Sequence, residues 1–374
     1  MSTRDTHLFS EGPKRILSLD GGGVRGAITL QFLQAMEDQL SERAGRRVLL
    51  HEHFDMIGGT STGAIIAGGL SIGMSAAEVS ELYSRLAPNV FRKSRWRIVG
   101  LQAKFTIREL KRELANVFGD MTFDSDRLLT GFCVITKRMD TGSPWIISNN
   151  PKALYWDDPP DNSYIGNRRY PVAKMIRAST AAPHYFDPEP VELFADGQKG
   201  LFVDGGVSPY NNPSLPLFLQ ASLPQHRLNW ALGPEKLTIV SVGTGGYRPL
   251  LPAREASGMT AAGLALRALT GLMFDTEAQT IGLMQALGTT PTPWQINSEV
   301  GDMQGMRLPG GPLFRYVRYD LRLEPDWIED NLGRKVDPAT ITHLRLMDDP
   351  KNMAKAQELA HLAAEQQVKI DHFT

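Results

Sequence analysis

The sequence G-T-S-T-G at residues 59–63 constrains the fold most strongly, because it joins two apolar runs through a turn flanked by glycines. Residues 54–57 precede it and residues 64–70 follow it, which is the pattern of a buried strand, a sharp turn and a buried helix. Such a turn lifts the Ser61 hydroxyl to the end of a sheet, at the positive N-terminus of a helix. We therefore predict a nucleophile elbow at Ser61, although a glycine-rich packing turn would have the same pattern.

The bulk composition favours a globular protein with a large core. The 374 residues are 42% hydrophobic and 22% charged, which suits a large α/β domain with insertions, or two domains, and argues against global disorder. A formal net charge of -1 provides no field that would attract nucleic acid. The single cysteine, Cys133, lies in an apolar run and excludes an internal disulfide. No cluster of histidines and cysteines indicates a metal site.

The N-terminal residues are polar, and we expect residues 1–13 to form a flexible tail. They contain no apolar signal core, and the longest apolar stretch, residues 63–74, is too short and too rich in glycine to span a bilayer. We therefore expect a soluble, cytoplasmic protein. Residues 14–215 are expected to form the core of the fold, and residues 216–374 to continue the same domain.

Apolar runs and helical periodicity alternate along the chain. Strands are expected at residues 15–19, 131–136, 201–204, 237–242 and 313–323. Helices are expected at residues 27–36, 76–86, 172–178 and 349–370, with a helix-rich stretch at 250–290 and an irregular insertion at 141–170. This alternation predicts an α/β fold with a mainly parallel sheet. Glycine-rich turns follow strands at residues 21–23, 59–63, 205–206 and 243–246, and in a parallel sheet they would meet at one edge.

The loop Gly21-Gly22-Gly23 is the candidate source of oxyanion donors. Without Cβ atoms its N–H groups can approach a developing negative charge, and Arg25 adds a charge that would steady the loop or meet a phosphate head group. Gly21, Gly23 and Gly26 also match the G-x-G-x-x-G dinucleotide fingerprint, so an oxidoreductase that binds nicotinamide or flavin is an alternative. That alternative lacks an acidic residue at the right distance and leaves the serine turn unexplained.

The general base is the weakest element of the pattern. His51 and His53 flank Glu52 in what we interpret as a polar loop, and only His184 could lie near the pocket. Asp204 ends an apolar strand before two glycines, where an Asp–Gly turn is the local interpretation. A buried carboxylate at that position would accept the serine proton if burial raised its pKa.

Three motifs, in this order, resemble the patatin-like phospholipase family: D-G-G-G-V-R-G at residues 20–26, G-T-S-T-G at 59–63 and D-G-G at 204–206. The resemblance covers residues 14–215, and S-V-G-T-G at 241–245 is also similar to the family. It implies a three-layer α/β/α sandwich with a catalytic core at 14–215. It also implies calcium-independent hydrolysis of phospholipid acyl esters through an acyl-serine intermediate, with no cofactor required.

The resemblance also implies the role of each motif residue. Ser61 would be the nucleophile and Asp204 the base, in a dyad without histidine. The oxyanion hole would be formed by Gly21, Gly22 and Gly23, supported by Arg25. The remaining motif positions are Gly26, Gly59, Gly63, Gly205 and Gly206.

A lipid acyl hydrolase needs access to a membrane, on which this protein would act peripherally. Residues 91–112 mix basic and aromatic side chains, which suits an anionic lipid surface or, alternatively, a solvated face with aromatics turned to the core. The layout from residue 250 onward is similar to bacterial patatin-like antiphage effectors that cyclic nucleotides trigger. A cyclic-nucleotide activator, bound at 91–112 or at 141–170, is therefore a hypothesis, as is a homodimer. A non-catalytic lipid- or nucleotide-binding module is the third class of function.

Overall fold

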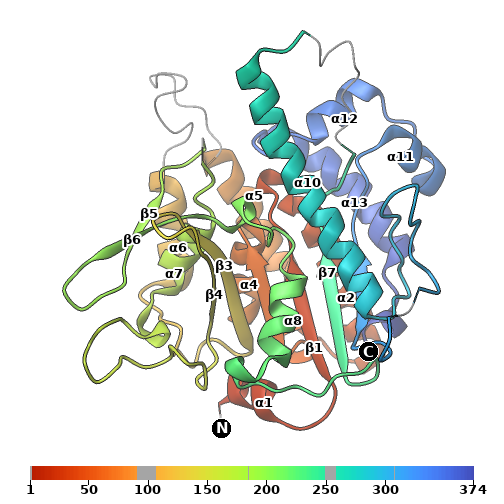
Figure 1. Cartoon of the computed structure of the whole chain (residues 1–374). Helices are drawn as coiled ribbons and strands as arrows, with labels where there is room; N and C mark the ends of the chain where they lie inside the picture. Colours follow the sequence, from red (N-terminus) through yellow and green to blue (C-terminus); the bar gives the residue numbers. More distant parts are fainter. Residues whose placement is uncertain (1, 91–106, 184, 249–257, 307) are drawn as a thin grey trace.

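The computed structural model describes residues 2–90, 107–183, 185–248, 258–306 and 308–374 (Figure 1). The strands are β1 (Lys14–Leu19), β2 (Met56–Thr60), β3 (Gly131–Arg138), β4 (Pro144–Ser148), β5 (Glu189–Glu192), β6 (Lys199–Asp204), β7 (Leu237–Val242) and β8 (Arg315–Tyr319). The α-helices are α1 (Thr3–Phe9), α2 (Gly26–Ala44), α3 (Leu50–His53), α4 (Thr62–Ser71), α5 (Ala76–Val90), α6 (Ile107–Phe118), α7 (Val172–Ser179), α8 (Ser214–Ser222), α10 (Ala261–Leu287), α11 (Pro325–Leu332), α12 (Pro338–Leu344) and α13 (Met353–Gln367).

The strands form one sheet in the order β5-β6-β3-β2-β1-β7-β8, with β4 paired to β3. The pairs β3–β2, β2–β1, β1–β7 and β7–β8 are parallel, so the carboxyl ends of these strands lie at one edge. The pairs that involve β4, β5 and β6 are antiparallel. The mainly parallel sheet is confirmed, but β6, which carries Asp204, does not belong to the parallel set that we expected.

Apolar side chains fill both faces of the sheet, because successive residues of a strand point to opposite faces. Leu17 of β1 and Ile57 of β2 belong to the core that α2, α4, α5, α7 and α13 cover. Their neighbours Ile16 and Met56 belong instead to a second core cluster with Leu217 of α8 and Met284 of α10, so α8 and α10 cover the other face of the sheet (Figure 1). The fold is therefore the three-layer α/β/α sandwich that the family resemblance implied.

The N-terminal segment is not a flexible tail throughout, as we had expected. Residues Thr3–Phe9 form α1, which Ser2 caps through its side chain, and Leu8 is 1% exposed. The Trp230 indole N–H donates to the Leu8 carbonyl at 2.9 Å. The prediction was wrong because polarity along the sequence does not reveal a single apolar side chain that anchors a short helix in the core.

Other boundaries also differ from the expectation. Helix α5 continues through Pro88 to Val90 instead of ending before the proline, and β8 is shorter than the run at 313–323. The insertion at 141–170 contains β4, which pairs with β3. The expected final helix is divided into a short 3₁₀ turn at Pro350–Asn352, helix α13 and a second turn at Ile370–His372. Most of the basic segment 91–112 lies outside the described residues, and only its end belongs to α6.

Candidate active site

Strands β2 and β6 meet end to end along one edge of β3, and this arrangement brings Ser61 and Asp204 together. Thr60, the last residue of β2, pairs with Ile135, whereas Asp204, the last residue of β6, pairs with Thr136. Both Ile135 and Thr136 pair with β4 on their opposite side. The two strands therefore share an edge and run towards each other. The antiparallel direction of β6 is what delivers Asp204 to the carboxyl end of β2.

Ser61 and Asp204 are in direct contact. The Ser61 hydroxyl donates a hydrogen bond to Asp204 Oδ2 at 2.5 Å, and the Gly206 N–H donates to Asp204 Oδ1 at 2.7 Å. Asp204 is 5% exposed. Burial is the largest influence on this carboxyl and raises its pKa to about 6. The hydrogen bonds from Ser61 and Gly206 and the positive charge of Arg177 lower the pKa and so partly oppose the effect of burial. The carboxyl is thus mostly ionised at neutral pH and is placed to accept the serine proton.

The backbone at Ser61 has the geometry of a nucleophile elbow. Its φ of 54° and ψ of −120° put a non-glycine residue in an unusual conformation between β2 and α4. Its N–H donates to the Ser179 hydroxyl at 2.8 Å, which in turn donates to the Ile135 carbonyl at 2.5 Å. A Cβ on Gly59 would lie 2.1 Å from the Gly63 carbonyl oxygen, so the turn is too tight for a side chain there.

The glycine loop after β1 lies against the serine. A Cβ on Gly21 would come within 3.2 Å of the Ser61 Cβ. The Gly21 N–H donates to the Asn211 carbonyl at 3.2 Å, so this group is already engaged. Within the described part of the chain, the N–H groups of Gly22 and Gly23 have no acceptor. The loop therefore presents two free donors, Gly22 and Gly23, where the sequence had suggested all three glycines.

Arg25 is turned away from solvent. It is 8% exposed, and its Nη1 donates to the Gly245 carbonyl at 2.9 Å, in the turn after β7. Burial lowers the pKa of Arg25. The side chain thus joins the glycine loop to a neighbouring turn, which is the steadying role that we considered, and its burial does not favour contact with a phosphate head group.

The remaining motif glycines allow close packing. A Cβ on Gly26 would lie 2.1 Å from Thr62 Cγ2, and a Cβ on Gly63 would lie 2.2 Å from the Leu19 carbonyl oxygen. At Gly205 it would lie 2.6 Å from the Ile135 carbonyl oxygen. At Gly206 it would lie 3.1 Å from Asp204 Oδ1. These positions keep the glycine loop, the elbow and the end of β6 in contact with one another.

The candidate histidines are placed elsewhere or are not described. His51 and His53 lie in α3, which precedes β2 and therefore lies at the edge opposite Ser61. Burial lowers the pKa of His53 to about 4, and its Nε2 lies 2.8 Å from the Phe373 carbonyl oxygen. His184 lies outside the described residues. Among the residues with described side chains, no group of histidine, cysteine, aspartate and glutamate could hold a metal ion.

A buried ion cluster directly behind the glycine loop was missed in the sequence. Arg318 of β8 is fully buried, and its guanidinium lies 2.7 Å from Asp20, 2.9 Å from Asp320 and 3.1 Å from Glu277 of α10. Burial raises the pKa of Asp20 well above its ordinary value, although the charge of Arg318 opposes this. Charged residues at alternate positions of a predicted strand, 318 and 320, were the available signal.

Comparison with known proteins identifies the family. The family model described as patatin-like phospholipase matches residues 17–218, more than half of the chain. The chain belongs to the patatin-like phospholipase family. No helix in the described part of the chain is long and apolar enough to cross a membrane.

Several curated relatives are similar over part of their length. A cUMP-AMP-activated phospholipase of Escherichia coli is 30% identical over 62% of this chain and 65% of its own length. A cGAMP-activated phospholipase of Escherichia coli (strain TW11681) is 27% identical over 62% of each chain. The calcium-independent phospholipase A2-gamma of Homo sapiens is 34% identical over 62% of this chain and 28% of its own length. The chain thus spans less than two thirds of each of these relatives.

Proposed function

We propose that this protein is a lipid acyl hydrolase that cleaves fatty-acyl esters of phospholipids with Ser61 as nucleophile and Asp204 as general base. The observation that carries the proposal is the 2.5 Å contact between the Ser61 hydroxyl and a buried Asp204 carboxylate. An aspartate with a pKa of about 6 is ionised at neutral pH yet basic enough to take a serine proton in the transition state.

The reaction follows from this geometry in two stages. Asp204 accepts the Ser61 proton as the oxygen attacks the acyl carbonyl, and the N–H groups of Gly22 and Gly23 stabilise the oxyanion. The proton passes from Asp204 to the departing lysophospholipid oxygen, which leaves an acyl-serine. Water then gives a proton to Asp204 and attacks the acyl carbon, and the returning proton restores Ser61 as the fatty acid leaves.

The dinucleotide alternative is less well supported by the sheet. In a dinucleotide fold the strand next to the glycine loop ends in an acid that binds the ribose. The parallel neighbours of β1 are β2, which ends at Thr60, and β7, which ends at Val242. A non-catalytic lipid- or nucleotide-binding module is also less well supported, because binding alone would not require an aspartate in contact with a serine at a strained elbow.

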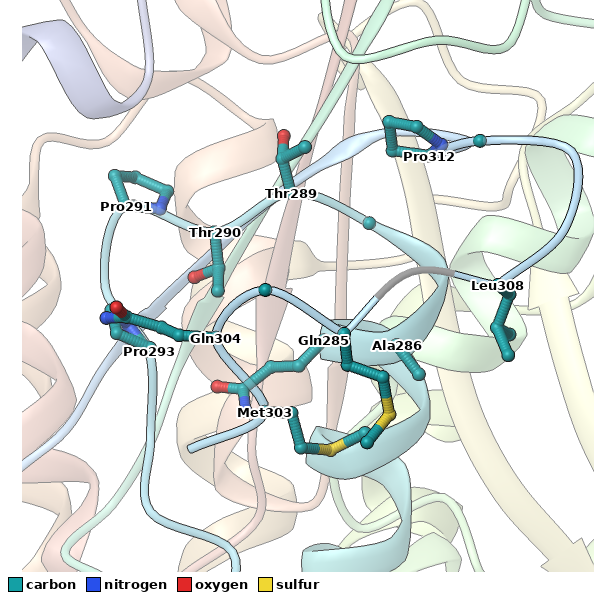
Figure 2. A pocket seen from close by; sticks show the side chains of 14 residues that line it. Gln285, Ala286, Thr289, Thr290, Pro291, Pro293, Met303, Gln304, Leu308 and Pro312 are labelled. Carbon is teal, nitrogen blue, oxygen red and sulfur yellow. The ribbon is translucent and has the colours of Figure 1, made fainter. Parts of the chain in front are cut away.

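We further propose that a cyclic nucleotide activates the enzyme and that it acts peripherally on membrane phospholipid. Support for the activator comes from the two bacterial relatives, whose names state activation by cUMP-AMP and by cGAMP. A pocket of about 300 Å³ lies between the end of α10 and residues 288–291, 293, 303–306, 308 and 311–312. Figure 2 shows the side chains that line it. Its described lining residues carry no charge, and Thr289 pairs with Arg315 at the start of β8, away from Ser61. We therefore do not assign an anionic nucleotide to this pocket.

Fluorophosphonate labelling and phospholipid hydrolysis on vesicles test both proposals. Wild type is compared with Ser61→Ala, Asp204→Asn and the exposed control Ser84→Ala, each with and without cUMP-AMP or cGAMP. We expect labelling that requires Ser61, and a loss of turnover of at least about 10³-fold in both dyad variants but not in the control. Near-wild-type hydrolysis by either dyad variant would refute the dyad. Equal turnover with and without nucleotide would refute the activator alone.

A further inference from the structure

The Gly21 carbonyl is held by side chains that the proposed mechanism does not use. The Thr244 hydroxyl donates a hydrogen bond to it at 3.0 Å, and the Asn211 Nδ2 donates a longer one at 3.3 Å. Thr244 is 6% exposed, and a Cβ on Gly22 would lie 2.2 Å from its Oγ1. The threonine therefore packs directly against the glycine loop and fixes the direction of one of its carbonyls.

That carbonyl belongs to the same peptide unit as the Gly22 N–H. In a planar trans peptide the C=O and the N–H point in opposite directions, so fixing one fixes the other. If the unit rotated, the Gly22 N–H would turn away and the Gly21 carbonyl would face the acyl oxygen instead. A hydroxyl that donates to this carbonyl opposes the rotation, because the rotation would leave a buried donor without an acceptor.

The turn that carries the threonine is itself held on both sides. The Gly243 carbonyl accepts a hydrogen bond from Thr29 Oγ1 at 2.7 Å. The Gly245 N–H donates to Asp320 Oδ1 at 2.8 Å, and its carbonyl accepts the bond from Arg25 at 2.9 Å. The Thr244 hydroxyl is thus presented by a backbone that Thr29 of α2, Arg25 and Asp320, which directly follows β8, all restrain.

We infer that Thr244 is a positioning residue for catalysis: its hydroxyl holds the Gly21–Gly22 peptide in the orientation that offers the Gly22 N–H to the oxyanion. This inference rests on the proposed function, because it assumes that Ser61 attacks an acyl carbonyl beside the loop. It predicts an effect on the transition state rather than on substrate binding, since the donor is needed when negative charge develops.

Steady-state kinetics on a soluble ester and fluorophosphonate inactivation rates test the inference. Thr244→Val keeps the shape of the side chain but removes the hydroxyl, whereas Thr244→Ser keeps the hydroxyl. We expect Thr244→Val to lower kcat by about 10-fold, less than the 10²–10³-fold cost of losing a donor outright, with KM within about 2-fold of wild type. Thr244→Ser should retain kcat within about 3-fold, and fluorophosphonate inactivation should slow in parallel with kcat.

A matched control separates positioning from stability. Thr130 is fully buried, and its hydroxyl donates to the Phe54 carbonyl at 2.6 Å, but it precedes β3 at the opposite edge of the sheet. Thr130→Val should match Thr244→Val in stability loss while keeping kcat. Equal kcat in wild type and Thr244→Val, or an equal kcat loss in the Thr130 control, would overturn the inference while leaving the dyad intact. Full turnover by Ser61→Ala would overturn the proposed function and this inference with it.

Discussion

Replacing Asp204 with asparagine should stabilise the protein while it abolishes turnover. The folded protein holds the Asp204 carboxyl at 5% exposure, and burial is the largest cause that raises its pKa from 3.8 to about 6. At 1.36 kcal/mol for each tenfold change in proton affinity, the ionised carboxylate destabilises the folded state by about 3 kcal/mol. Asparagine has nearly the same shape and carries no charge, so it avoids this cost.

The stability gained by Asp204→Asn should depend on pH. Because the pKa is raised in the folded state, the folded protein binds the proton more tightly than the unfolded chain does. The destabilisation is therefore absent below pH 3.8, grows as the pH rises to about 6, and is complete above that value. The stability gain of Asp204→Asn should follow the same course, with a small effect near pH 4 and the full effect near pH 7.5.

Thermal unfolding followed by fluorescence measures this gain. An unfolding entropy of about 2.1 cal/mol/K per residue gives about 0.8 kcal/mol/K for 374 residues, so about 3 kcal/mol should raise Tm by about 4 °C at pH 7.5. Asp126→Asn, which removes the same charge from an exposed position, is the control and should leave Tm within about 1 °C. A Tm that falls in Asp204→Asn, or that rises equally at pH 4 and pH 7.5, would refute the argument from desolvation.

Three further outcomes follow from the same geometry. The kcat/KM of the wild type on a soluble ester should fall at acidic pH, with a midpoint near pH 6. Arg177→Met should move that midpoint upward, because the charge of Arg177 lowers the pKa of Asp204. A flat profile from pH 5 to 8 would contradict this prediction. Gly22→Ala should remove turnover in the same assay, because the new Cβ would lie 2.2 Å from Thr244 Oγ1, and retained activity would show that the loop can move aside. Cys133, which is fully buried and whose pKa burial raises to about 12, should not react with a thiol reagent until the protein unfolds, and rapid reaction of the native protein would contradict that burial.

The sequence was informative where local geometry alone selects the residue. At Gly59 and Gly63 a side chain would collide with the backbone, so a tight turn between a strand and a helix accounts for both glycines. Helix α7 was also predicted within a residue of its ends, because its apolar spacing is regular. Asp204 was a candidate base from its place at the end of an apolar strand, but only the family resemblance favoured that role over an Asp–Gly turn, which has the same residues.

Partners that are distant in the sequence could not be predicted. No local sequence pattern indicates that the Gly21 N–H donates a hydrogen bond to the Asn211 carbonyl, or that the Thr244 hydroxyl donates one to the Gly21 carbonyl. The direction of β6 was equally hidden, because an apolar run ending in aspartate is the same in a parallel and an antiparallel strand. These features depend on which elements become neighbours, and that is decided by the packing of the whole sheet.

Two of the groups that hold the glycine loop come from beyond the part of the chain that the family model matches. That match ends at residue 218, whereas Thr244 follows β7, and the Met347 carbonyl, which accepts the Val24 N–H at 2.9 Å, lies between α12 and α13. A Cβ on Gly23 would lie 2.1 Å from that same carbonyl oxygen, so the C-terminal third packs closely on the loop. A change in the C-terminal third that shifts these two contacts would alter the oxyanion donors without touching either dyad residue. The proposed activator could therefore act on the proposed oxyanion donors by shifting these two contacts.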